Sequence, residues 1–134
     1  LEPSQILMLP AEAVRTAFDR DGAFARAIVR ELSASFRGVM KELKSHKLRT
    51  SAERLANWIL AHDARAGGSG SFPLPYDKRT LAARLGMTPE NLSRNLAQLS
   101  QHGATVKNRL VVIGDRAKLI AFARPTPSMD DLDY

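Results

Sequence analysis

Residues 81–94 read LAARLGMTPENLSR, and this stretch decides the fold expected of the 134-residue chain. Apolar residues recur at helical spacing on both sides of Gly86, which predicts one helix over residues 76–85 and a second over residues 89–101. Glycine adopts the left-handed backbone of a tight turn at little cost. Two helices joined by a short glycine turn are a candidate helix-turn-helix.

The spacing inside this helix pair is specific. Ala82 is small enough for the point where two helices cross, and Leu92 can fill the core between them. Thr88 can cap the second helix, and Pro89 suits its first position, where a missing N–H costs nothing. The second helix then presents a polar face made of Glu90, Asn91, Ser93 and Arg94.

A basic hairpin is predicted after the two helices. Residues 104–106 and 110–113 have the composition of strands, and residues 107–109 between them read Lys-Asn-Arg. A hairpin in this position is the wing of a winged helix-turn-helix. Asp115 can cap a last helix that ends near Phe122. The expected fold class is therefore mainly α with a small β-hairpin wing.

A long helix is predicted before the helix-turn-helix. Asp21 can cap it, and residues 22–47 carry apolar side chains at steps of three and four, close to a heptad seam. An amphipathic helix packed on its own core would show the same stripe. However, the lone strand expected at residues 5–9 and the short helix expected at residues 11–18 offer little core to cover. The pattern favours a homodimer interface made of Ile28, Leu32, Phe36, Val39 and Leu43.

The remaining segments carry shorter signals. Thr50 and Glu53 are spaced as a capping box that begins a further helix. Residues 67–71 read GGSGS and predict a flexible connector. Residues 72–75 are expected to be extended because each proline biases its predecessor toward the β region. Residues 125–134 are polar and acidic and are expected to be disordered.

The charge balance points to a polyanionic partner. The net charge is +6, and since residues 124–134 contribute −2, the first 123 residues carry +8. Nucleic acid is the commonest partner for such a surplus of positive charge. The alternative is that the basic composition only favours solubility.

Other function classes find little support. The absence of cysteine excludes disulfides, thiolate zinc sites and iron–sulfur clusters within the chain. His46, His62 and His102 lack metal-site spacing, and no nucleophile–base pair or phosphate-cradling loop is present, so we expect no enzyme activity and no cofactor. No apolar run approaches ~20 residues, so no membrane span is expected, and a cytoplasmic location fits. The chain opens on Leu1 without a signal peptide and is expected to be a fragment.

Residues 81–94 resemble the helix-turn-helix of the Crp–Fnr superfamily of bacterial transcription regulators. The resemblance covers nearly the whole chain up to about Phe122. It implies four parts: residues 1–19 as the end of an effector-binding β-roll, 20–48 as the dimerisation helix, 49–124 as the winged helix-turn-helix DNA-binding domain, and 125–134 as the tail.

The resemblance also implies how DNA is read. Members of the superfamily use a Glu-x-x-Ser-Arg set, which Glu90, Ser93 and Arg94 fill here. Arginine can hold guanine O6 and N7 as a fork, glutamate can accept from cytosine N4, and serine can contact a neighbouring base. This is the Fnr-type set, which implies a palindrome with half-sites near TTGAT. Pro89 departs from several relatives, which have arginine there. The alternative is a solvated helix face with Glu90 favoured by the helix dipole.

Further polar residues around this helix are predicted to contact the DNA backbone. They are Lys78, Arg79, Thr88, Asn91, Lys107 and Arg109, and for each of them ordinary surface charge is the alternative. The resulting hypothesis is a regulator that binds double-stranded DNA as a homodimer, with RNA polymerase as a further partner implied by the resemblance. The alternative from another class is a winged helix that binds protein rather than DNA.

The effector is not identified by these residues. In the cyclic-AMP receptor of this superfamily, a Thr-Ser pair on the dimerisation helix contacts the nucleotide. Ungapped alignment puts Val39 and Met40 at these places, and neither side chain has a hydroxyl group. This argues against cyclic AMP bound in that way and leaves a haem-bound gas or a redox signal open.

Overall fold

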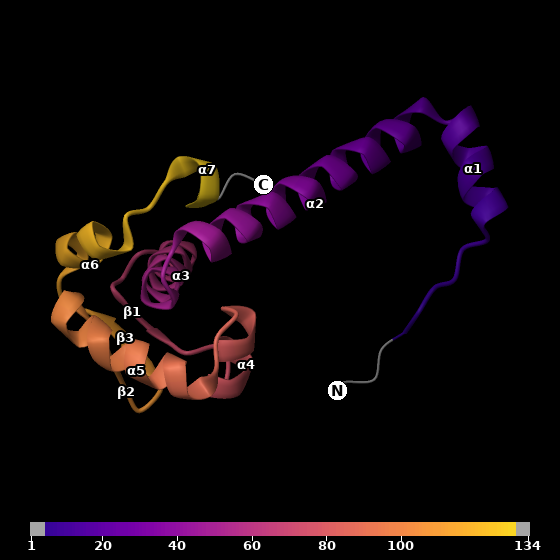
Figure 1. The fold of residues 1–134 in the computed structure, drawn as a ribbon. Helices are drawn as coiled ribbons and strands as arrows, with labels where there is room; N and C mark the ends of the chain where they lie inside the picture. The colour runs from indigo at the N-terminus through magenta and orange to yellow at the C-terminus, as the bar shows by residue number, and fades with distance from the viewer. Residues whose placement is uncertain (1–4, 131–134) are drawn as a thin grey trace. The chain divides into compact units, whose positions relative to one another are not determined.

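Helices make up most of the computed structural model, which describes residues 5–130 (Figure 1). The helices are α1 (Ala11–Arg20), α2 (Gly22–Leu48), α3 (Ser51–Arg65), α4 (Lys78–Arg84), α5 (Pro89–Leu99), the 3₁₀ helix η1 (Ser100–His102), α6 (Arg116–Ala123) and α7 (Pro127–Asp130). The strands are β1 (Ser71–Pro73), β2 (Ala104–Lys107) and β3 (Leu110–Ile113). The predicted fold class, mainly helical with a small sheet and a long helix before the helix-turn-helix, is confirmed.

The first of two compact units ends at residue 39 and contains α1 and most of α2. Asp21 begins α2 as predicted, because its Oδ1 accepts hydrogen bonds from the backbone N–H groups of Ala23 at 2.8 Å and Phe24 at 3.1 Å. The lone strand predicted at residues 5–9 is wrong, since this segment contains no strand. A strand needs a neighbour for its backbone hydrogen bonds, and no described strand pairs with this segment.

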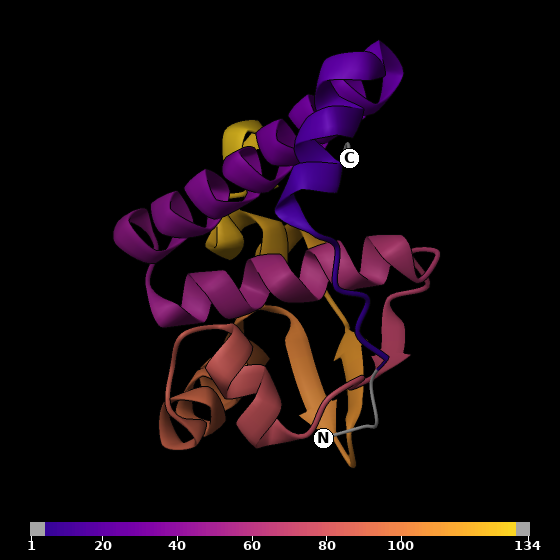
Figure 2. The same cartoon turned by 90° about the vertical axis from the view of Figure 1, so that its right-hand side faces the viewer.

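The second unit, residues 40–134, is built around α3. The apolar face of α3 is buried, and the helix packs against both α5 and α6. Figure 2 shows α3 crossing this unit with the sheet, α4 and α5 on one side of it. The largest fully buried apolar side chains of the core are Leu55, Ile59, Leu81, Leu92, Leu99, Val111 and Leu119. The last nine residues of α2 belong to this unit.

The predicted hairpin is present and gains a third strand. The strand order is β1-β3-β2, and both pairings are antiparallel. Val111 at the centre of β3 lies opposite Phe72 of β1 and Val106 of β2. Phe72 and Val111 are buried, so this pairing brings their side chains into the core. Residues 72–75 were expected to be extended, but their pairing with β3 was not foreseen. Pro73 is tolerated because β1 is an edge strand.

Capping residues set where the helices begin. The capping box is confirmed: Thr50 Oγ1 accepts from the Glu53 N–H at 3.2 Å, and Glu53 Oε2 accepts from the Thr50 N–H at 2.7 Å. The helix predicted over residues 76–85 begins at residue 78 because Asp77 is its cap, accepting from the Thr80 N–H at 2.6 Å. This hydrogen bond holds the pKa of the Asp77 carboxyl below its ordinary value.

Helix ends follow similar local rules. The α-helix predicted to residue 101 ends at Leu99, and η1 continues it to Gly103, which has a φ of +87°. Asp115 caps α6 as predicted, with its Oδ1 accepting from the Lys118 N–H at 3.0 Å. In the segment expected to be a disordered tail, residues 127–130 form the short helix α7, and residues 131–134 lie outside the described residues.

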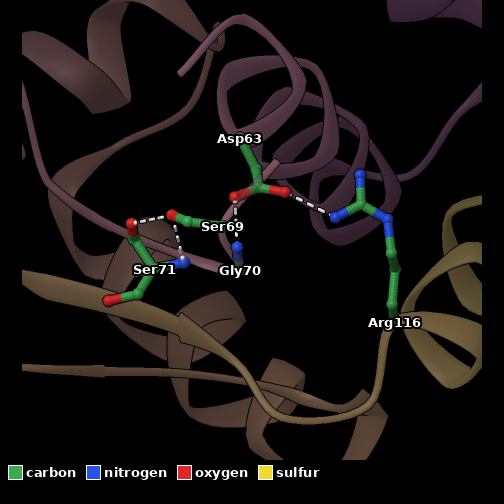
Figure 3. A network of polar contacts seen from close by, with 5 residues as sticks. All are labelled: Asp63, Ser69, Gly70, Ser71 and Arg116. Atoms are coloured by element: carbon green, nitrogen blue, oxygen red, sulfur yellow. Dashed lines mark hydrogen bonds and ion pairs between the residues drawn. The ribbon is translucent and has the colours of Figure 1, made fainter. Parts of the chain in front are cut away.

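A buried carboxylate fastens the glycine-rich segment between α3 and β1. Asp63 is fully buried; its Oδ1 accepts from the Gly70 N–H at 2.8 Å, and its Oδ2 pairs with Arg116 Nη1 at 2.5 Å (Figure 3). Ser69 Oγ donates to the Ser71 carbonyl at 2.8 Å. Residues 67–71, predicted as a flexible connector, are thereby tied to α3 and α6.

We predict that Arg116→Ala destabilises the chain by about 2–3 kcal/mol, because it leaves the buried Asp63 carboxylate without its cation. The value lies below that of a fully buried pair because the Arg116 side chain is 44% exposed. Lys118→Ala is the matched control, since it removes an exposed ion pair to Asp115 on the same helix. It should change the free energy of unfolding by less than about 0.5 kcal/mol. Urea unfolding measures both values, and equal losses for the two variants would contradict the prediction.

Candidate nucleic-acid interface

The helix-turn-helix is closed by its own residues. Leu81, Ala82 and Leu92 have no exposed area, so the predicted crossing residue and core residue lie where expected. Gly86 has a φ of +59° in the turn, and Thr88 Oγ1 caps α5 by accepting from the Asn91 N–H at 3.2 Å. These contacts fix α5 relative to α4.

The turn is also held from outside by two residues that sequence reasoning missed. Arg54 of α3 donates from Nε to the Leu85 carbonyl at 3.2 Å and from Nη2 to the Gly86 carbonyl at 3.4 Å. The imidazole ring of His46, near the end of α2, lies so close to Gly86 that a Cβ there would overlap it. Both partners are more than thirty positions from the turn, and no local sequence pattern marks such contacts.

The polar residues of α5 lie on its solvent side. Glu90, Asn91, Ser93 and Arg94 are all exposed, whereas Leu92 and Asn95 are buried. The pKa of Glu90 is lowered by its own backbone N–H, then by the Thr88 hydroxyl and the nearby Arg94 charge. Glu90 is therefore ionised at neutral pH and acts only as an acceptor.

A groove lies between α5 and the wing. Its volume is about 560 Å³. Figure 1 shows the β2–β3 hairpin beside α5, and the contacts between α5 and β2 agree with this. The groove is lined by Ser93 and Ala97 of α5, Lys107 of β2, and Lys78 at the start of α4. Positive and hydroxyl side chains therefore meet at its edges.

The predicted site residues are only partly brought together. Lys78, Ser93, Lys107 and Arg109 line this groove, whereas Arg79, Thr88, Glu90, Asn91 and Arg94 are not among its lining residues. Arg109 differs from the others, because its Nη2 donates to the Leu74 carbonyl at 3.3 Å and to the Tyr76 carbonyl at 3.4 Å. Its guanidinium is turned back onto the protein.

Two of the three histidines, His62 and His102, take part in ring packing. His62 stacks on Trp58 with ring centroids 5.2 Å apart, and His102 stacks on Phe122 at 4.0 Å. Among residues 5–130, no three histidine, cysteine or acidic residues are placed to hold a metal ion. No helix in the described part of the chain has the length and apolar character needed to cross a membrane.

Comparison with known proteins identifies similar domains. Residues 53–122 match the family described as the Crp-like helix-turn-helix domain. A protein from Silicibacter pomeroyi, provisionally described as a cAMP-binding regulatory protein, is 31% identical with a TM-score of 0.59, over 87% of this chain and 51% of that one. The structure of FixK2 from Bradyrhizobium japonicum is 26% identical with a TM-score of 0.68, over 86% of this chain and 59% of that one.

A third structure shares the fold alone. It is a protein from Eubacterium rectale, provisionally assigned as a transcriptional regulator of the Crp/Fnr family, with 19% identity and a TM-score of 0.72 over 87% of this chain and 53% of that one. This chain thus spans little more than half the length of these similar proteins. No match was found among curated protein sequences.

A left-handed φ costs a residue with a Cβ about 1–2 kcal/mol. We predict that Gly86→Ala lowers the free energy of unfolding by more than this backbone cost. The excess arises because the new methyl group must displace the His46 ring. The same substitution in a His46→Ala background should cost less, because only the backbone penalty remains. Denaturant unfolding of the four proteins of this double-mutant cycle tests the contact. An equal loss of unfolding free energy in both backgrounds would show that the His46 ring does not restrict the side chain at position 86.

Proposed function

Because this chain belongs to the family of Crp-like helix-turn-helix domains, which bind DNA and regulate transcription, we propose that two copies of it read a palindromic duplex. The family consists of transcription regulators and not of enzymes. In this proposal α5 enters the major groove, and the two copies contact half-sites about one helical turn, ~34 Å, apart.

The observation that carries the proposal is the exposed polar face at the beginning of α5. Glu90, Ser93 and Arg94 lie in the first two turns of the helix, and none of them contributes to the core. Arg94 is proposed to hold a guanine through O6 and N7, and Glu90 to accept from the amino group of a neighbouring cytosine or adenine. By resemblance the half-site is near TTGAT.

Phosphate contacts are proposed for the polar residues around that face. Lys78 and Lys107 stand on the edges of the groove between α5 and the wing, where one sugar-phosphate strand would lie. Arg79, Thr88 and Asn91 are exposed near the starts of α4 and α5 and complete the set. The net charge of the whole chain is +6, and this positive charge favours binding to DNA whatever its base sequence.

Dimerisation is proposed through α2. Leu32, Phe36 and Val39 are 64%, 66% and 63% exposed, and Leu43 is 45% exposed at the same helical spacing. Ile28 is half-buried. Apolar side chains in this number cost free energy while they face water, and pairing with a second copy would bury them. RNA polymerase remains a partner implied by the resemblance.

We propose that the effector is not cyclic AMP held by a hydroxyl pair on α2. One similar protein is provisionally described as binding cAMP. In this chain the places of the hydroxyl pair are held by Val39 and Met40. Neither side chain can donate a hydrogen bond to the nucleotide, which argues against cyclic AMP bound through these two positions.

We predict that Arg94→Ala weakens binding to a TTGAT palindrome roughly 5- to 150-fold for each half-site, the equivalent of one lost bidentate base contact. Preference at the guanine should relax, while non-specific binding changes little. Lys107→Ala is the matched control, and it should weaken binding to all DNA sequences alike. It should also lower the slope of log affinity against log salt concentration by about 0.9 for each lost phosphate contact.

Selection from randomised duplexes measures both effects. The wild-type chain should select a palindrome, and Arg94→Ala should lose information at the guanine position. If the wild type selects no palindrome, or if Arg94→Ala selects the same site as the wild type, the base-reading assignment is wrong. A shift in preferred bases caused by Lys107→Ala would contradict the assignment of the wing.

We predict that Leu32→Glu or Phe36→Glu converts the dimer to monomers, because a charge in the buried stripe would be unpaired. Arg37→Glu is the control, since Arg37 is exposed on the side of α2 away from the stripe. Sedimentation at micromolar concentration should give dimers for the wild type and for Arg37→Glu. A monomeric wild type at this concentration would refute the proposed interface.

A further inference from the structure

The turn of the wing is strained at a position that glycine normally holds. Asn108 and Arg109 join β2 to β3 with φ values of +49° and +65°. Two-residue hairpin turns with two positive φ values favour Asn-Gly, because glycine has no Cβ to clash. Asparagine tolerates the left-handed region, but arginine does not do so readily. Arg109 therefore occupies its place at a backbone cost that glycine would avoid.

The same residue fastens the wing through both its backbone and its side chain. The Arg109 carbonyl accepts from the Leu74 N–H at 2.7 Å, and Arg109 Nη2 donates back to the Leu74 carbonyl at 3.3 Å. Nη2 also donates to the Tyr76 carbonyl at 3.4 Å. Residues 74–76 lead directly to Asp77, the cap of α4. The wing turn is thus joined to the entry of the helix-turn-helix.

We propose that Arg109 is a positioning residue that sets the distance between the wing and α5, an inference that rests on the proposed DNA binding. Leu74, Tyr76 and Arg109 line the same groove as Ser93 and Lys107. Arg109 acts through Lys107, which stands two residues before it on the wing. The backbone strain is retained because the arginine side chain provides a connection that glycine cannot.

This role differs from the phosphate contact that the sequence suggested for Arg109. A residue that touches phosphate itself contributes its own counterion release, independently of Lys107. A residue that places Lys107 loses its effect once the Lys107 side chain is removed. The two roles therefore predict different coupling between the two positions.

The experiment is a double-mutant cycle of Lys107→Ala and Arg109→Gly, with affinity for a TTGAT palindrome measured over a range of salt concentrations. Arg109→Gly relaxes the turn but removes the side-chain connection. It should weaken binding at least tenfold and lower the salt slope by the same amount as Lys107→Ala. The double variant should bind the palindrome no more weakly than the single variant that binds it less tightly. Additive losses in affinity and slope would mean that Arg109 contacts phosphate directly and would overturn the proposal.

A charge-conserving variant provides a second test. Lysine is one bond shorter than arginine and lacks the planar fork, but it binds phosphate well as a point charge. If Arg109 positions the wing, the Arg109→Lys variant should therefore still bind the palindrome weakly. Restoration of wild-type affinity by Arg109→Lys would overturn the proposal.

Hydrogen exchange of the free chain separates this proposal from the proposed function. In Arg109→Gly the Leu74 amide and the amides of β2 and β3 should exchange faster, while the amides of α3 keep their protection. Unchanged exchange in the wing would overturn the proposal even if DNA binding falls. A wild-type chain that binds no duplex would refute the proposed function, and the exchange of the wing would still decide whether Arg109 holds it.

Discussion

At Gly86 the backbone takes a φ of +59°, and the arrangement of α4 and α5 follows from this single turn. Only glycine reaches that conformation without a steric cost, and here the missing Cβ also makes room for the His46 ring. Arg54 fixes the same turn by donating to the carbonyls of Leu85 and Gly86. The end of α2, the start of α3 and the helix-turn-helix therefore meet at one point.

The division of α5 into two faces follows from that arrangement. Leu92 and Leu99 are buried and α5 packs against α3 and α4, so the helix cannot rotate without exposing these two side chains. Glu90, Ser93 and Arg94 consequently remain on the solvent side. A helix that carries donors and acceptors on its exposed face is suited to contact base edges, because a partner can reach these groups without unfolding the core.

The sheet that contains the wing has only three short strands, and these strands contribute few buried side chains to the core. Two sets of polar contacts compensate for this. Asp63 links the Gly70 amide before β1 to Arg116 of α6, and Arg109 links the β2–β3 turn to residues 74–76. Loss of the Asp63 contacts should cost more free energy than loss of the Arg109 contacts, because Asp63 is buried and an unpaired carboxylate in the core is costly.

The features that depend on near neighbours along the chain could be predicted from the amino-acid sequence. The caps at Asp21, Thr50, Thr88 and Asp115, the turn at Gly86 and the β2–β3 hairpin were all predicted, because each involves groups within a few positions along the chain. The polar face of α5 was predicted for the same reason, since helical periodicity places its residues.

Which distant groups meet became apparent from the folded chain. Arg109 was predicted to contact phosphate, and residues 67–71 were predicted to be a flexible connector. In the structure Arg109 is joined to Leu74, 35 positions away, and Asp63 to Arg116, 53 positions away. The structure also pairs β1 with β3 and leaves residues 5–9 without a strand. Local patterns report backbone preference, but a long-range hydrogen bond depends on where packing brings two segments together, and nothing in the spacing of the residues records that.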